Sequence, residues 1–277
     1  MTKVGRLKLI FLAILVSVLY FKTFVWLGQV YRTDPENSHG FLIPLVLGYL
    51  IWSKRDVLKM AKSRPASWGV VLIVLAILLQ ILSFRAGVYI TSVLSFIILV
   101  TGLILYLMGS ELLKKLSFPV LYMFFLVPLP GLVQAILTFP MKIFASKVSA
   151  GILGAMGTPV LREGNVLVMP EYSFEVADAC SGLRSMMALL ALGALFAYFT
   201  QHTIFRKLLL FLLSVPIAIA ANIFRIVVTC LIAYYVSTSI VEGFLHEFSG
   251  ILVFMSAVVL LMATSKLMKL KVSGAKT

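Results

Sequence analysis

Long, predominantly apolar stretches recur along this chain, and they limit its possible folds more than any other feature. A run of about 20 apolar residues allows a helix to cross a ~30 Å hydrocarbon layer. Eight such runs cover residues 9–31, 38–53, 68–84, 88–108, 118–139, 183–200, 208–235 and 248–265. The second run is short and the fifth is interrupted. We therefore expect an all-α polytopic membrane protein with about eight transmembrane helices.

The composition excludes a soluble globular protein. Hydrophobic residues make up 61% of the chain and charged residues 12%, about half of what a soluble surface needs. The first apolar run is too long for a signal-peptide core and lacks a cleavage site, so we interpret it as a retained span. Without an internal repeat or a composition shift, residues 1–277 are expected to form a single integral membrane domain.

The net charge of +14 follows membrane topology rather than nucleic-acid binding. If every run crosses once, sixteen basic residues fall on one face: Lys3, Arg6, Lys8, Lys54, Arg55, Lys59, Lys62, Arg64, Lys114, Lys115, Arg206, Lys207, Lys266, Lys269, Lys271 and Lys276. Positive loops stay in the cytoplasm. We therefore expect a multi-pass plasma (inner) membrane protein with both termini cytoplasmic and no nucleic-acid partner.

Three features, from the middle of the fifth run to the start of the sixth, suggest a specialised outer region. The sequence VPLPG at residues 127–131 interrupts the fifth run, which favours either a cavity or an ordinary kink. Residues 141–156 alternate at helical spacing and predict an interfacial amphipathic helix. Residues 160–177 alternate in strand fashion around residues 163–165, which predicts a small extracytoplasmic β-hairpin just before Cys180.

Cys180 lies in the stretch EVADACSGLR, at the mouth of the sixth apolar run. Asp178 is suited to cap that helix, and the first turn of a helix favours a thiolate. Cysteine is also commonly an inert core residue, so position alone does not make Cys180 a nucleophile. A disulfide with Cys230 has little support, because Cys230 lies deep in the seventh run.

Arg225 is the one charge inside the seventh run, near its outer end by helical rise. A buried membrane arginine is costly and indicates function, although snorkelling to the headgroups is an alternative. Asn222 lies three residues earlier, on the same helical face, and is suited to hold the guanidinium. His246 lies two positions before the eighth run, at its outer end, and His39 lies at the outer boundary of the second. Either histidine can instead be a simple cap or a solvated side chain.

Together, Cys180, Arg225 and His246 are expected at similar depth on the outer face. A thiol nucleophile needs an acid or base, and a tetrahedral oxyanion needs a fixed donor. The three residues therefore indicate a thiol peptidase or transpeptidase acting at the extracytoplasmic face. Neither a metal nor another cofactor is expected, because the histidines at 39, 202 and 246 lack ligand spacing and no Gly-rich phosphate loop is present.

Five blocks of sequence also resemble the exosortases, of the exosortase/archaeosortase superfamily. They are SHGFLIPLVLGYLIW, GTPVLREGNVLVMP, EVADACSGLRSM, ANIFRIVVTCLIAYY and HEFSG. The resemblance implies that Cys180, Arg225 and His246 are catalytic. It implies substrates that are exported, membrane-anchored proteins with a C-terminal sorting signal: a Pro-Glu-Pro-like motif, a transmembrane helix and a basic tail. The new carboxyl end would pass through a thioacyl intermediate to a lipid or another amine acceptor, or to water.

Several points stay open at this stage. Arg184 lies one helical turn after Cys180 and is suited either to lower its pKa or to contact a phosphate. A transporter using Arg225 and the broken fifth span is an alternative, as is a non-catalytic membrane scaffold. The transporter predicts activity that survives cysteine replacement, and the scaffold predicts tolerance of alanine at all three positions.

Overall fold

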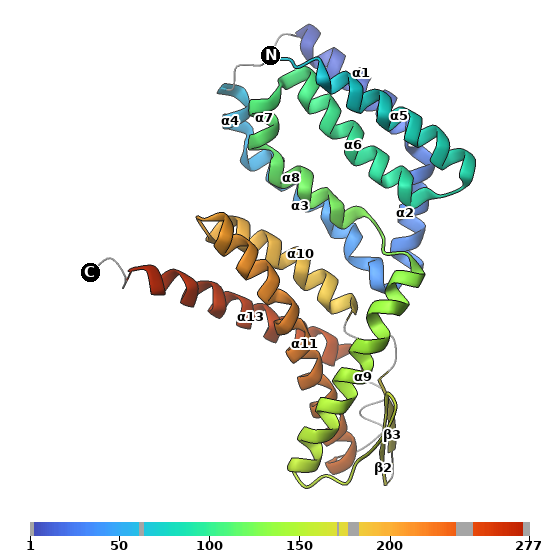
Figure 1. Cartoon of the computed structure of the whole chain (residues 1–277), viewed down its shortest axis with the longest axis vertical. Coiled ribbons are helices and arrows are strands. Elements are labelled where there is room, and N and C mark those ends of the chain that lie inside the picture. Colours follow the sequence, from blue (N-terminus) through green and yellow to red (C-terminus); the bar gives the residue numbers. More distant parts are fainter. Residues whose placement is uncertain (1–2, 61–63, 171, 177–182, 237–245, 274–277) are drawn as a thin grey trace. The chain divides into compact units, whose positions relative to one another are not determined.

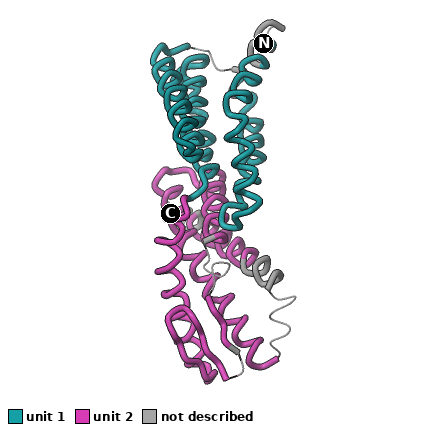
Figure 2. Tube along the Cα trace, turned by 90° about the vertical axis from the view of Figure 1, so that its right-hand side faces the viewer, with its two compact units in different colours: residues 1–129 teal, residues 130–277 magenta. Residues whose placement is uncertain are grey.

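The computed structural model describes residues 3–60, 64–170, 172–176, 183–236 and 246–273. These residues are almost entirely helical, with one small β-sheet (Figure 1). They form two compact units, residues 1–129 and 130–277 (Figure 2). This is the architecture of an all-α polytopic membrane protein. A single domain over the whole chain stays a prediction.

Unit 1 contains only helices among its described residues. They are α1 (Lys3–Leu19), α2 (Phe21–Thr33), the 3₁₀-helix η1 (Pro35–Phe41), α3 (Leu42–Ser53), α4 (Arg55–Met60), α5 (Trp68–Ala86), α6 (Tyr89–Met108), α7 (Ser110–Lys115), α8 (Ser117–Tyr122) and the 3₁₀-helix η2 (Met123–Leu126). Unit 2 contains α9 (Gly131–Ala155), the strands β1 (Leu161–Glu163), β2 (Val166–Met169) and β3 (Tyr172–Glu175), and then α10 (Leu183–Thr200), α11 (Ile204–Tyr235) and α13 (His246–Ser273).

Four helices in the described part of the chain are long and apolar enough to cross a membrane: α5, α6, α9 and α11. A fifth span results if residues 10–19 and 21–33, bent by 65°, are counted together. The expected second span is a 3₁₀-helix followed by α3, whose 12 residues cover only about 18 Å. The count of eight spans and the cytoplasmic termini stay predictions.

Buried polar groups stabilise the bend between α1 and α2. A break in a helix leaves carbonyl groups without intrahelical partners, which is costly where water is absent. Gln80 of α5 donates through Nε2 to the carbonyl of Leu19 at 3.3 Å. The Gln80 Oε1 atom accepts from Ser92 of α6, whose Oγ also bonds Thr23 of α2 at 2.6 Å. One set of side chains therefore joins α2, α5 and α6 at the bend.

Helices α5 and α6 approach closely because glycines lie at their interface. A Cβ atom added at Gly69 would meet the backbone nitrogen of Tyr106 at 2.5 Å and the carbonyl oxygen of Gly102 at 2.7 Å. Between apolar helices in lipid, association depends on this kind of close packing rather than on the hydrophobic effect. The interface therefore depends on the absence of side chains at these two positions.

Replacing Gly69 by alanine is expected to destabilise the protein by about 1–3 kcal/mol, the usual cost of overpacking. The clash is with backbone atoms, so rotamer changes cannot relieve it. The thermal unfolding midpoint of the detergent-solubilised full chain measures the effect. Gly28→Ala is the matched control, because a Cβ atom there meets nothing within 4 Å. Equal midpoints for the two variants would contradict the close α5–α6 contact.

The break predicted at residues 127–131 is present and separates the two units. The 3₁₀-helix η2 ends at Leu126 and α9 begins at Gly131. Side chains of unit 1 hold the end of η2: Tyr31 donates to the carbonyl of Leu126 at 2.6 Å, and the Asn37 side chain accepts from the amide of Leu129 at 3.1 Å. The expected fifth span is therefore divided between η2 and α9.

The prediction of a separate amphipathic helix at residues 141–156 was wrong. Helix α9 continues through Pro140 to Ala155. Its small polar residues Ser146 and Ser149 are buried, whereas Phe144 is 52% exposed. Small polar residues can pack against protein in a membrane helix while a large apolar one faces outward. The helical spacing was detected correctly, but it belongs to one continuous helix.

Candidate functional site

The small sheet of unit 2 packs against α9 and α11 (Figure 1). Its strand order is β1-β2-β3, with both pairs antiparallel. Residues 160–177 thus form three strands where the sequence predicted a two-stranded hairpin. The shared apolar cluster consists of Ala145, Leu153, Leu167, Met169, Val176, Ile226, Val227, Cys230 and Ala233. Five buried residues of this cluster come from α9, β2 and the position after β3, and four come from the C-terminal half of α11.

The chain leaves β3 at a point that is packed against α11. Val176, just after β3, is fully buried and packs in the cluster that contains Ile226 and Val227. Its amide donates to the carbonyl of Asn165 at 3.0 Å, and the Asn165 side chain donates back to the carbonyl of Val176 at 3.3 Å. These bonds hold the backbone at the start of the stretch that leads to Cys180.

Cys180 itself lies outside the described residues, as does Asp178. Cys180 lies four positions after Val176 along the chain and three positions before the start of α10 at Leu183. The expected thiolate in the first helical turn therefore stays a prediction. Cys230, the other cysteine, is fully buried in the apolar cluster of α11.

The opposite ends of the helices in unit 2 meet in a second cluster. Ala197 of α10, Leu210 of α11 and Leu261 of α13 are buried together. Close by, Gln201 donates through Nε2 to the hydroxyl of Ser265 at 3.1 Å, and that hydroxyl bonds Thr200 at 2.7 Å. The end of α10 and the late part of α13 are therefore joined by polar as well as apolar contacts.

Counting residues from this second cluster gives similar axial lengths to three helix segments. Arg225 lies fifteen residues after Leu210, and His246 lies fifteen residues before Leu261. At a rise of ~1.5 Å per residue, each lies about 22 Å from the cluster. The start of α10, fourteen residues before Ala197, lies about 21 Å from it by the same measure. We use the name Arg225 end of unit 2 for these three segments (Arg225 and the starts of α10 and α13) together with the exit from β3.

Asn222 lines a small pocket between α9 and α11. The pocket has a volume of about 210 Å³ and is lined by Pro140, Met141, Phe144, Ala145, Ile219 and Asn222. Asn222 is 5% exposed, and Arg225 is partly buried one turn further along α11. Pro140, which lacks a backbone N–H, forms part of the wall on the α9 side. An amide in an otherwise apolar pocket gives that space one directional hydrogen-bonding group.

The remaining supporting residues lie in different places. Arg184 is exposed in the first turn of α10, at the Arg225 end. His39 belongs to unit 1, in η1 and outside the candidate spans. Its Nδ1 atom lies 3.3 Å from the carbonyl oxygen of Glu36, and burial lowers the pKa of His39 below its ordinary value. His39 is therefore neutral at pH 7, with one ring nitrogen directed to the backbone.

Asn165 is a positioning residue that the sequence analysis did not single out. The Gly164–Asn165 pair is a turn signal, and Gly164 has the left-handed φ of 64° that favours glycine. That signal predicts the turn only. The contact of Asn165 with Val176 depends on the third strand, which brings residues eleven apart into register. Within the described ranges, no group of three or more His, Cys, Asp or Glu side chains is arranged to hold a metal ion.

Comparison with known proteins gives one match. A family model described as transmembrane exosortase matches residues 29–263, which is most of the chain. The matched region begins within α2 and ends within α13, so it includes the sheet, the stretch around Cys180 and the Arg225 end. No curated protein and no solved structure matches this chain.

Proposed function

Since this chain belongs to the transmembrane exosortase family, we propose that it is a membrane-embedded cysteine peptidase or transpeptidase that processes C-terminal sorting signals of exported proteins. The family is one of membrane cysteine transpeptidases involved in protein sorting. The observation that supports the proposal is the Arg225 end of unit 2. There Val176 packs with Ile226 and Val227, next to Arg225 in sequence, and the starts of α10 and α13 lie about as far along their helices from the second cluster as Arg225 does.

In this proposal Cys180 is the nucleophile. An extended chain covers at most ~3.6 Å per residue, so the four residues from Val176 keep Cys180 within about 14 Å of that anchor. His246 takes the thiol proton, and the thiolate attacks the scissile carbonyl carbon, forming a C–S bond. Arg225 donates hydrogen bonds to the resulting oxyanion. When the C–N bond breaks, His246 returns the proton to the leaving amine.

The thioacyl enzyme is then resolved by water or by an amine on a lipid or another acceptor, with His246 removing the proton of the incoming group. Asn222 fixes the Arg225 side chain, and Arg184 stabilises the Cys180 thiolate. The substrate is an exported, membrane-anchored protein whose sorting motif reaches the Arg225 end. The loop charges support a site at the extracytoplasmic face of the inner membrane.

The direct test is mass spectrometry of a candidate substrate, an exported protein with the tripartite C-terminal signal, produced with and without this chain. We expect a new C-terminus near the short motif only when the chain is present. An intact C-terminus in both cases would contradict the proposal. A gradient-dependent transport activity that needs no cysteine would instead favour the transporter alternative.

A further inference from the structure

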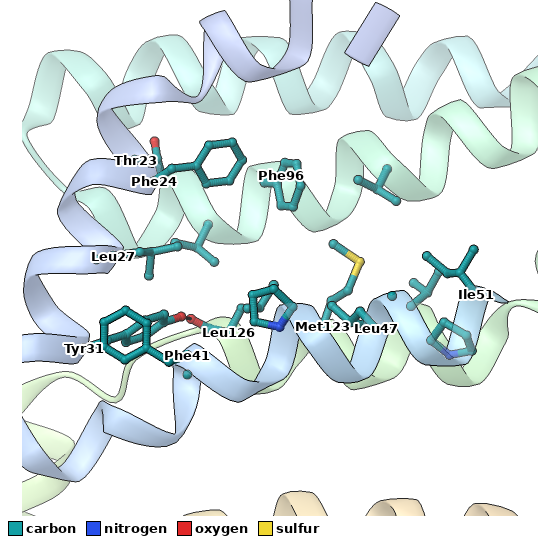
Figure 3. Close-up of a pocket in the computed structure, with 18 of the residues that line it drawn as sticks. Thr23, Phe24, Leu27, Tyr31, Phe41, Leu47, Ile51, Phe96, Met123 and Leu126 are labelled. Carbon is teal, nitrogen blue, oxygen red and sulfur yellow. Dashed lines mark hydrogen bonds between the residues drawn. The ribbon is translucent and has the colours of Figure 1, made fainter. Parts of the chain in front are cut away.

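Unit 1 contains an apolar cleft that the proposed chemistry does not use. Its volume is about 640 Å³, and it lies between α2, α3, α6 and α8 with η2 (Figure 3). Thr23 and Tyr31 are its two hydroxyl-bearing lining residues, and both hydroxyls are engaged, with Ser92 and with the carbonyl of Leu126. The cleft therefore has the size of a ligand site but offers no side-chain hydroxyl to a polar ligand.

The cleft is elongated. Tyr31, Phe41 and Leu126 lie near one another at one end, and Ile51 lies at the other (Figure 3). Lining residues extend over ten residues of η1 and α3, from Phe41 to Ile51, which is about 15 Å at helical rise. This is about half of a ~30 Å hydrocarbon layer, the depth of one leaflet. The dimensions match one extended acyl chain.

A transmembrane helix is too large for this space. A membrane-spanning helix is ~30 Å long, about twice the length over which residues of η1 and α3 line the cleft. The cleft has exposed residues at both ends, because Phe41 is 46% exposed and Ile51 is 49% exposed. Two glycines of its wall, Gly28 and Gly48, have nothing within 4 Å of an added Cβ atom. A flexible, narrow chain can enter there from the bilayer.

Basic residues surround the Ile51 end. Lys54 follows Ile51 by one turn, and its ammonium donates to the carbonyl of Lys115 at 2.6 Å, next to the lining residue Leu116. Arg55 lies over the ring of Trp52 at 4.5 Å. With Lys114 these are four basic groups, against two acidic ones in the same segments, Asp56 and Glu111. The surplus positive charge attracts an anionic headgroup and repels a basic peptide tail.

We propose that this cleft holds one acyl chain of an anionic phospholipid, with the headgroup among Lys54, Arg55, Lys114 and Lys115. The cleft is lined by residues of unit 1 alone, none of which belongs to the proposed catalytic set, and the proposal does not depend on the proposed catalytic function.

The test uses the full chain reconstituted in nanodiscs of phosphatidylglycerol and phosphatidylcholine with identical acyl chains. After transfer to detergent, native mass spectrometry counts the lipids that remain bound. We expect one retained phosphatidylglycerol, at least about tenfold in excess over phosphatidylcholine. Inorganic phosphate added in excess should not displace it, because the acyl chain supplies part of the affinity.

Two variants separate the parts of the site. Gly28→Leu with Gly48→Leu fills the cleft and should reduce retention of both lipids about tenfold. Arg55→Gln with Lys114→Gln should remove the preference for phosphatidylglycerol and leave phosphatidylcholine unchanged. The matched controls are Gly151→Leu, where an added Cβ atom also meets nothing within 4 Å, and Lys207→Gln, both in unit 2. Unchanged retention in the leucine variant, or equal retention of both lipids by the wild-type protein, would overturn the proposal.

A second measurement on the wild-type protein does not depend on the folding of any variant. Phosphatidylglycerol with a photoreactive group on its acyl chain is crosslinked in the nanodisc, and the labelled peptides are mapped. Labels concentrated on α3 and α8 support the site. Labels spread over α1 and α5 without enrichment at the cleft, or capture of a peptide helix there in place of lipid, would exclude it.

Discussion

Cys180→Ala is expected to abolish processing of a tailed substrate, with a loss of at least about a thousandfold in turnover. Alanine keeps the backbone and removes only the sulfur, so no thioacyl intermediate can form. The rate of appearance of the new C-terminus, measured by mass spectrometry, gives the size of the effect. Substrate binding should persist, because the thiol contributes to the covalent step and not to docking.

The other cysteine provides the matched control. Cys230 is buried in the apolar cluster of α11 and the sheet, where alanine removes a small group from the core. Cys230→Ala should therefore lower the unfolding midpoint slightly and leave turnover nearly unchanged. In this variant Cys180 is the one remaining thiol, so a thiol-alkylating reagent should inactivate the enzyme and label a single peptide. Full activity of the Cys180→Ala variant would contradict the proposed covalent mechanism.

Arg225→Lys is expected to reduce turnover by about 10²–10³-fold, the usual cost of losing an oxyanion donor. Lysine keeps the positive charge but replaces a planar fork of donors with a single ammonium. The loss should appear in kcat, with KM changed little, because the oxyanion exists only after attack. Steady-state kinetics on a peptide with the sorting motif separates these two constants.

Arg206→Lys is the control on the same helix. Arg206 lies in the first turn of α11, nineteen residues before Arg225 and close to the opposite end of unit 2. Its exchange should leave both kinetic constants unchanged. The unfolding midpoints of the two variants should lie close to that of the wild-type protein. If Arg225→Lys retains full turnover, the role of Arg225 is electrostatic or structural, and the donor assignment is wrong.

Local signals predicted much of the fold. The apolar runs at residues 68–84 and 88–108 became α5 and α6, because helices in lipid must satisfy their own backbone groups and a long apolar run allows this. The VPLPG break was predicted for the same reason, since two prolines remove backbone donors. The strands within residues 160–177 were also predicted, because apolar and polar residues alternate where one face of a strand is buried.

The faces of helices were harder to predict. Ser146 and Ser149 are polar, so a rule derived from water-soluble proteins turns them outward. In the structure they are buried, and Ser146 donates to the carbonyl of Gly164 at 3.0 Å. The medium around a helix decides whether its polar side chains face inward or outward. The sequence of one helix does not show whether lipid, water or protein covers each face. The third strand was missed for a related reason, because β3 pairs with β2 through contacts that no local pattern encodes.

For this protein, the sequence alone indicated which stretches are long and apolar enough for membrane helices and where the fifth run breaks, and it selected Cys180, Arg225 and His246 as the candidate reactive groups. Those features are local: apolarity, proline and a charge inside an apolar run each act through the nearest residues. Tertiary structure decided what lies beside what. The contacts of Leu210 with α10 and α13, and of Val176 with α11, set the level of Arg225. These contacts depend on packing between segments that are far apart in the chain. The free energy of such packing is distributed over many side chains.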